Sequence, residues 1–288
     1  MRILKGGKAM KHSRVLFTAL CFYLIYLGQS HAQTIEIHTD NLADLYALKS
    51  KNTDDNLSVA TNLHALNILF DHLKFEYMTT KRSLKLMDSS KNICIVNKVK
   101  TRNRIDKYLF SQPVNLFLSR RLYQHTSYPP LDADELINDS VRLPDIFIKR
   151  PAAKVIISGQ ISYGDILDAQ IAQLAEANIL TRHSSEHDKG VIAMFSKGRA
   201  EFALLYPHQV FGSDLTINGR SYSVSSIPPY ILGHLMCTKN EVTKRFINNV
   251  NNHLSDPKSV DTLFKIHTGY INPIDKVVME SYFRHAFF

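Results

Sequence analysis

The sequence predicts an α/β fold, because short runs rich in β-branched and aromatic residues alternate along the chain with segments of helical periodicity. Residues 35–38, 74–78 and 93–96 are expected strands, and apolar residues recur at helical spacing in the expected helices at residues 57–73, 241–254, 259–268 and 274–283. Strands that alternate with helices favour a largely parallel sheet. In such sheets ligands bind beyond the carboxyl ends of the strands.

The first 32 residues have the pattern of a cleaved secretory signal. Residues 15–27 form an apolar run, which is shorter than the roughly 20 residues that span a membrane, and Ser30-His31-Ala32 offers a small-x-small cleavage site. We expect cleavage after Ala32 and a mature periplasmic protein, residues 33–288. Intact-mass measurement would check this. The apolar run is preceded by no acidic residue and by five basic ones, Arg2, Lys5, Lys8, Lys11 and Arg14.

Charge and motifs exclude several classes of function. The chain has 35 Lys and Arg against 26 Asp and Glu, and without the five basic residues of the leader 30 remain against 26. This excess is mild and no basic stripe carries interleaved aromatic residues, so no nucleic-acid partner is predicted. The sequence also has no P-loop, H-E-x-x-H or G-x-S-x-G motif. No cofactor is expected.

The mature chain has two cysteines, Cys94 and Cys237, which an oxidising compartment allows to form one disulfide. They do not form a C-x-x-C motif, so neither a zinc ribbon nor a thioredoxin-type site is indicated. His183 and His187 have a spacing found in metal sites, but their polar surroundings are typical of a loop. We therefore predict no metal site.

One segment, residues 92–123, combines a strand, a basic turn and an F-S-x-P sequence. Thr101 and Arg104 lie in the turn, and Phe110, Ser111 and Pro113 follow before a second apolar run at residues 116–123. This order resembles the segment of type II periplasmic solute-binding proteins of family 3, the polar amino-acid-binding kind, that holds the ligand anion. There the pattern is roughly T-x-x-R and then F-S-x-P, leading into the hinge between two lobes.

The resemblance implies that Thr101 and Arg104 bind the ligand. A planar guanidinium grips a carboxylate through two parallel hydrogen bonds, whereas lysine supplies only a point charge. Arg102, Arg120 and Arg121 have no counterpart in the pattern and are expected to be solvated.

The second half of the chain extends the resemblance. The loop of residues 158–164, S-G-Q-I-S-Y-G, resembles the second-lobe ligand loop, which implies contacts from Gly159, Ser162 and Tyr163. Residues 198–207 resemble the G-R-x-D strand, and Tyr206 stands where amino-acid-binding members carry an acid for the ligand's ammonium group. Asp40 follows the first strand and is either a cleft residue or a helix cap or turn residue.

The resemblance implies an α/β, two-lobed type II periplasmic-binding-protein fold with the ligand cleft between the lobes. Residues 33–120 and 224–288 would form lobe 1, and residues 121–223 lobe 2. In this fold the strand that carries Cys94 and the strand that returns with Cys237 are neighbours in one sheet, so a disulfide between them is implied. The alternative is two buried free thiols.

The implied function is capture of a small, anionic ligand by hinge closure, for an ABC-type permease or a sensor kinase, by a protein that is expected to be a monomer and not an enzyme. Tyr206 cannot neutralise an ammonium group, so an α-amino acid is disfavoured unless Asp40 reaches the amine. Two alternatives remain. One is a dehydratase-like enzyme that uses Asp40 or Glu201, and the other is a protein-binding scaffold without a ligand.

Overall fold

The computed structural model describes residues 34–53, 56–67, 72–89, 91–159, 161, 163–183, 187–213 and 219–287. The leader and Ser162 lie outside these residues, so the cleavage after Ala32 and the ligand contact of Ser162 stay predictions. Among the helices of the described residues, none is long and apolar enough to cross a membrane.

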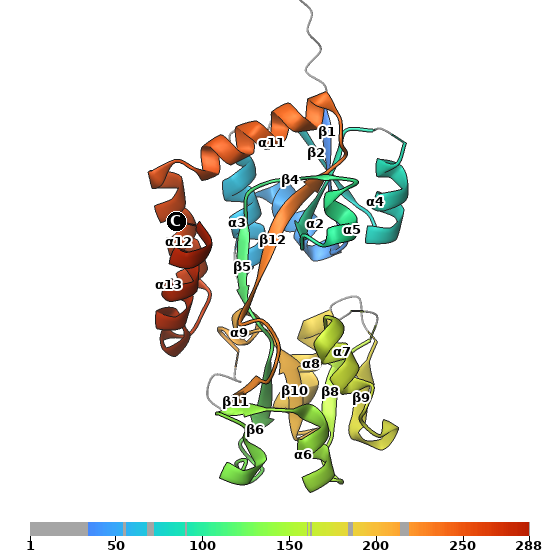
Figure 1. Cartoon of the computed structure of the whole chain (residues 1–288), viewed down its shortest axis with the longest axis vertical. Coiled ribbons are helices and arrows are strands. Elements are labelled where there is room, and N and C mark those ends of the chain that lie inside the picture. Colours follow the sequence, from blue (N-terminus) through green and yellow to red (C-terminus); the bar gives the residue numbers. More distant parts are fainter. Residues whose placement is uncertain are drawn as a thin grey trace, which may run out of the picture. The chain divides into compact units, whose positions relative to one another are not determined.

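The first of two sheets has the strand order β2-β1-β3-β12-β4, and β5 also pairs with β12 (Figure 1). β1 is parallel to both β2 and β3, whereas β12 is antiparallel to β3, β4 and β5. The predicted α/β arrangement is therefore present, but the sheet is mixed: the expected strands β1, β2 and β3 are parallel, whereas the returning strand β12 makes only antiparallel pairs. The strands are β1 (Ile35–Thr39), β2 (Leu73–Tyr77), β3 (Ile93–Lys98), β4 (Leu109–Phe110), β5 (Asn115–Leu118) and β12 (Tyr230–Cys237).

Amphipathic helices cover this sheet. In α11 the buried residues Phe246, Val250 and Leu254 share one face, and they pack on the sheet residues Ile37 and Leu235 in one core. The predicted helix 241–254 has the bounds that the structure shows. The helices of this half are α2 (Leu42–Ser50), α3 (Leu57–Leu66), α4 (Thr80–Met87), α5 (Arg102–Ile105), α11 (Glu241–Leu254), α12 (Pro257–Gly269) and α13 (Pro273–Phe287).

The second sheet has the order β7-β11-β6-β10-β8-β9, and β10 is parallel to β8. All four residues of β10 are buried, as a central strand with both faces covered requires. Its strands are β6 (Arg121–His125), β7 (Ser140–Val141), β8 (Val155–Ser158), β9 (Ile179–Arg182), β10 (Phe202–Leu205) and β11 (Gly219–Val224). Its helices include α6 (Leu143–Lys149), α7 (Asp165–Ile171), α8 (His187–Ser196) and α9 (Pro207–Val210).

The chain passes from one sheet to the other at Ser119 and Arg120. Residues 116–123 were expected to be one apolar run, but β5 pairs with β12 in the first sheet while β6 pairs with β10 and β11 in the second. The Ser119 N–H donates to the Pro229 carbonyl at 3.0 Å, so the outgoing and returning segments are joined at the crossing. We call Ser119–Arg120 and residues 225–229 the hinge.

Cys94 and Cys237 are opposite each other in the register of β3 and β12, with their Cα atoms 4.0 Å apart. They form the disulfide that the resemblance implies. The bond therefore joins two central, buried strands that are 143 residues apart in the sequence.

Candidate functional site

Three polar residues meet at the carboxyl ends of the parallel strands of the first sheet. Asp40 follows β1, Thr80 begins α4 just after β2, and Lys98 ends β3. The Asp40 carboxylate accepts hydrogen bonds from Thr80 Oγ1 at 2.6 Å and from Lys98 Nζ at 3.1 Å. Partial burial opposes ionisation of Asp40, but the Lys98 charge and these hydrogen bonds hold its pKa below the usual value. Asp40 is therefore an ionised carboxylate with its charge already paired.

The N-cap of α2 is Asn41, not Asp40. The Asn41 side chain accepts hydrogen bonds from the N–H groups of Ala43 and Asp44. The helix-cap alternative for Asp40 is therefore wrong.

Thr101 and Arg104 lie at the same edge, in the short helix α5 that follows β3. Thr101 is the exposed N-cap of α5, and its side chain makes no capping hydrogen bond. Arg104 is half-buried and donates from Nη1 to the Val99 carbonyl at 3.2 Å. One end of its guanidinium is thus held by the backbone, and no ion pair of Arg104 is present among the described residues.

In the second sheet, Gly159 follows β8 and Tyr206 follows β10, so both stand at the carboxyl ends of parallel strands. The Gly159 N–H donates to the Arg182 carbonyl at 2.9 Å, so this amide continues the pairing of β8 with β9. A Cβ at Gly159 would lie 2.6 Å from the ring of the exposed His183, so a larger residue here would require that ring to move. The buried Tyr163 hydroxyl accepts a hydrogen bond from the Ser158 N–H at 2.6 Å.

Arg120 contacts both tyrosines of the predicted site. Its Cζ atom lies 4.3 Å from the ring centroid of Tyr163 and 4.1 Å from that of Tyr206. Arg120 is only 9% exposed, so the expectation that it is solvated is wrong. The two rings attract the cation through their π faces and replace part of its hydration. The one sequence signal for this arginine is its position, two residues after the strand β5 that follows the F-S-x-P sequence.

Further aromatic rings extend this cluster along α9 and β5. The Tyr206 ring stacks on His208, with centroids 5.3 Å apart and planes at 23°, and Phe117 lies 5.0 Å from His208. Burial and, next, the Arg120 charge lower the pKa of His208 to about 3. His208 is therefore neutral at neutral pH, and Arg120 is the charged group of the cluster.

Glu201 lies at the other end of β10. Its carboxylate accepts hydrogen bonds from Arg150 Nη1 at 2.7 Å and from Gln124 Nε2 at 2.8 Å, and the side chain is buried. Arg150 also pairs with the buried Glu135. The two carboxylates considered for catalysis, Asp40 and Glu201, thus belong to different sheets, and each already has a cationic partner.

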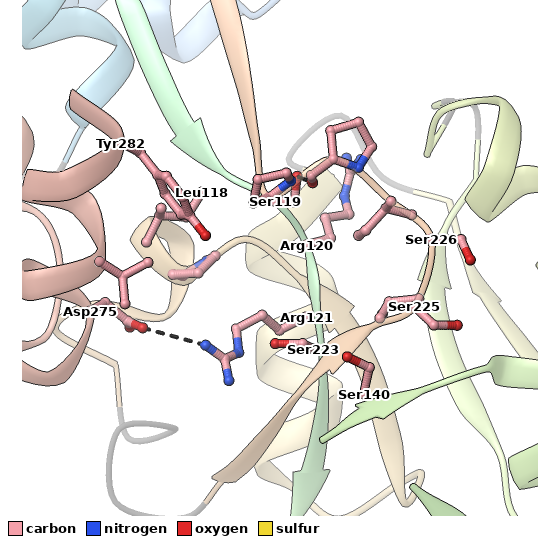
Figure 2. Close-up of a pocket in the computed structure, with 16 residues that line it drawn as sticks. Leu118, Ser119, Arg120, Arg121, Ser140, Ser223, Ser225, Ser226, Asp275 and Tyr282 are labelled. Atoms are coloured by element: carbon pink, nitrogen blue, oxygen red, sulfur yellow. Dashed lines mark hydrogen bonds and ion pairs between the residues drawn. The ribbon is translucent and has the colours of Figure 1, made fainter. Parts of the chain in front are cut away.

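A cavity of about 280 Å³ lies beside the hinge (Figure 2). Arg121 extends from β6 toward Asp275 of α13, with 3.5 Å between Nη1 and Oδ1, so Arg121 is not fully solvated either. The Arg121 Nε is buried and has no hydrogen-bond partner among the described residues. The remaining lining consists largely of hydroxyl and apolar side chains, among them Leu118, Ser119, Ser140, Ser223, Ser225, Ser226, Ile227, Val278 and Tyr282.

No group of three His, Cys, Asp or Glu side chains that could hold a metal occurs in the described part of the chain. The His187 side chain lies outside it.

No family model matches the sequence, and no curated protein matches it either. Solved structures do match. A protein from the glutathione and cystine import system of Streptococcus mutans is 15% identical, with a TM-score of 0.55 over 83% of this chain and 94% of that one. An ancestral cationic amino-acid solute-binding protein is 16% identical, with a TM-score of 0.54 over 83% and 96%. A second structure describes that ancestral protein as a precursor of cyclohexadienyl dehydratase.

A histidine kinase sensor domain similar to periplasmic binding proteins is 9% identical, with a TM-score of 0.53 over 83% of this chain and 96% of that one. At these identities the likeness shows the fold. The family resemblance is thereby confirmed as a likeness of fold, and the chain has the two-lobed type II periplasmic-binding-protein fold that the resemblance implies.

Proposed function

We propose that this protein is an extracytoplasmic solute-binding protein that captures a small anionic ligand by closure of two lobes about the hinge. Lobe 1 would comprise residues 33–120 and 224–288, and lobe 2 residues 121–223. The fold supports the proposal, since the similar structures include binding proteins of ABC importers. So does the hinge, where two short segments connect sheets that each have their own core.

In this proposal Arg104 and Thr101 hold an anionic group of the ligand from lobe 1. The loop after β8 contributes from lobe 2 through Gly159, Ser162 and Tyr163. Because the Gly159 N–H is bonded to Arg182, the contact from Gly159 would come from its Cα rather than from its amide.

The proposal that the ligand is an anion rests on the pairing of Asp40 with Lys98. An amino-acid ligand needs an acid for its ammonium group, and Tyr206 has no charge to offer. Asp40 is the other acid considered for that role, and it is paired with Lys98 and bonded to Thr80. A buried ammonium group without a partner charge costs several kcal/mol. Since each 1.4 kcal/mol is a factor of ten in affinity, that cost removes micromolar binding.

Two destinations fit a captured ligand, a membrane permease or a sensor, because similar structures include parts of ABC importers and a kinase sensor domain. Adjacent permease and ATPase genes would favour transport, and an adjacent sensor kinase gene would favour signalling. A second candidate function is a dehydratase-like enzyme, which the ancestral precursor suggests. The cationic partners of Asp40 and Glu201 argue against it.

The proposal is tested by a thermal-shift screen against small metabolites, since a ligand that binds only the native state raises its melting temperature. Calorimetry then compares wild type with Arg104→Ala. Loss of a buried charge pair costs about 2–5 kcal/mol, so we expect affinity for an anionic hit to fall roughly thirtyfold or more. Arg102→Ala removes the same charge from the exposed face of the same turn and should bind normally. Tight binding of an unmodified amino acid, or unchanged affinity in Arg104→Ala, contradicts the proposal.

A further inference from the structure

Arg120 is a buried cation without an acidic partner among the described residues, unlike Arg121 and Arg150. Arg150 pairs with Glu135 and Glu201, and Arg121 pairs with Asp275. Arg120 is 91% removed from solvent, yet among the described residues it has neither an ion pair nor a hydrogen bond. Its guanidinium nitrogens are not among the buried nitrogen atoms that lack a partner, so they remain open to solvent and to a ligand.

The ring contacts of Arg120 leave its hydrogen-bonding capacity unused. Tyr163 and Tyr206 each approach the guanidinium carbon with the ring, at 4.3 and 4.1 Å. Such contacts attract the positive charge but do not satisfy five N–H donors. They also fix the position of a planar group that is well suited to hold a carboxylate through two parallel hydrogen bonds.

The location of Arg120 is that of a ligand residue. Both tyrosines follow the parallel strands β8 and β10 at their carboxyl ends, where ligands bind in α/β sheets. Tyr206 also stands where the family resemblance places an acid for the ligand's ammonium group. In this chain the Arg120 guanidinium lies over the Tyr206 ring at that place. The charge there is therefore positive, whereas the acid of the family pattern is negative.

We propose that Arg120 binds a second anionic group of the ligand, so that the captured solute is a small dianion, such as a dicarboxylate without an ammonium group. This inference rests on the proposed function, in which Arg104 holds the first anionic group. It adds the class of ligand and a specificity-determining residue that belongs to neither of the sequence motifs.

The test uses linear dicarboxylates of two to ten carbons, each beside the monocarboxylate of equal length. Calorimetry on the mature protein should show at least one dicarboxylate that binds tenfold or more tightly than its monocarboxylate. Glutarate and glutamate differ by one ammonium group, and the glutamate should bind more weakly.

Arg120→Met keeps an unbranched apolar side chain between the two tyrosines and removes the charge. We expect it to bind dicarboxylate and monocarboxylate equally. Arg120→Lys keeps the charge but not the planar donors and should retain only part of the preference, which keeps the test decisive if Arg120→Met does not fold. Arg102→Gln removes one positive charge from an exposed position and should keep the full preference.

The outcomes separate the two proposals. A wild-type protein that binds monocarboxylates and dicarboxylates equally, with binding lost in Arg104→Ala, overturns the role of Arg120 and leaves the proposed function standing. A preference for dicarboxylates that survives in Arg120→Met overturns the inference as well. Binding of neutral or cationic solutes, with no carboxylate of the panel bound, overturns both.

Discussion

Arg120 and Arg121 are adjacent in the chain, but their guanidinium groups lie in different surroundings. Arg120 contacts the rings of Tyr163 and Tyr206, and Arg121 reaches 3.5 Å from Asp275 of α13. Successive side chains of an extended backbone point to opposite sides. Arg120 therefore faces the aromatic cluster of the second sheet, while its neighbour connects that sheet to a helix that packs on the first.

The first prediction concerns that connection. Arg121→Met should lower the free energy of unfolding by about 1–3 kcal/mol at pH 7, because it leaves the mostly buried Asp275 carboxylate without its cation. The matched control is Arg284→Met, which breaks the exposed ion pair with Glu280 and should cost less than about 0.5 kcal/mol. Urea unfolding measures both. Equal effects would show that the Arg121–Asp275 pair contributes no more than a surface pair.

The second prediction concerns the disulfide. It closes a loop of 143 residues, so the chain-entropy model gives it an upper value of about 5 kcal/mol. We expect reduction, or the double change Cys94→Ala with Cys237→Ala, to lower the urea midpoint by a corresponding amount. Thiol titration in denaturant confirms that the bond is present before reduction and absent afterwards. A midpoint that does not change on complete reduction would contradict this prediction.

The third prediction concerns pH. His267 is fully buried, its Nδ1 donates to the Leu263 carbonyl at 2.7 Å, and its Nε2 accepts from the Leu116 N–H at 2.9 Å. This pattern requires a neutral ring, and burial lowers the pKa of His267 to about 4. In the unfolded chain the pKa is about 6.5. The stability contributed by the neutral ring is thus fully present above pH 6.5 and is lost as the pH falls from 6.5 to 4.

The shift corresponds to a loss on the order of 3 kcal/mol over that interval. Urea unfolding between pH 8 and pH 4 should show it, and His267→Gln should reduce the slope of stability against pH. The buried His38 and His234, whose pKa values burial also lowers, add to the slope and should remain in the variant. A slope identical in wild type and His267→Gln would contradict the assignment.

The elements that sequence reasoning placed well are those whose apolar residues follow one period. α11 has the predicted bounds, and α12 and α13 differ from expectation by a few residues at their ends. α2 was not predicted because its pattern is obscured. Tyr46 is exposed in that helix while the charged Asp44 is buried, so no apolar stripe marks its inner face.

The break between β5 and β6 escaped prediction for a different reason. No glycine or proline marks it, and the apolar character continues on both sides of Ser119 and Arg120. What ends β5 is tertiary: its partner strand β12 begins at Tyr230, opposite Leu118, and β6 finds new partners in the second sheet. A pattern read within one segment cannot contain that information.

The candidate site also contains contacts that the sequence could predict and contacts that it could not. The meeting of Asp40 with Lys98 could have been predicted, because parallel neighbouring strands end at one edge and each residue follows or ends its strand. The cluster around Arg120 could not, because it joins side chains from three distant segments, at residues 120, 163 and 206. Their approach depends on how the second sheet packs beside the hinge.

The disulfide also limits which residues can move in the proposed closure. It fixes the end of β12 at Cys237 to the centre of the first sheet, while the other end of the strand, at Tyr230, enters the hinge. β12 is therefore held in place at one end, and in the proposed closure it cannot slide along β3 when the second sheet rotates. The backbone changes of the proposed closure are therefore confined to the hinge, Ser119–Arg120 and residues 225–229. Because Arg120 belongs to the hinge, an anion bound to it would act close to the axis of the proposed rotation. There a small displacement of the backbone corresponds to a large rotation of the second sheet.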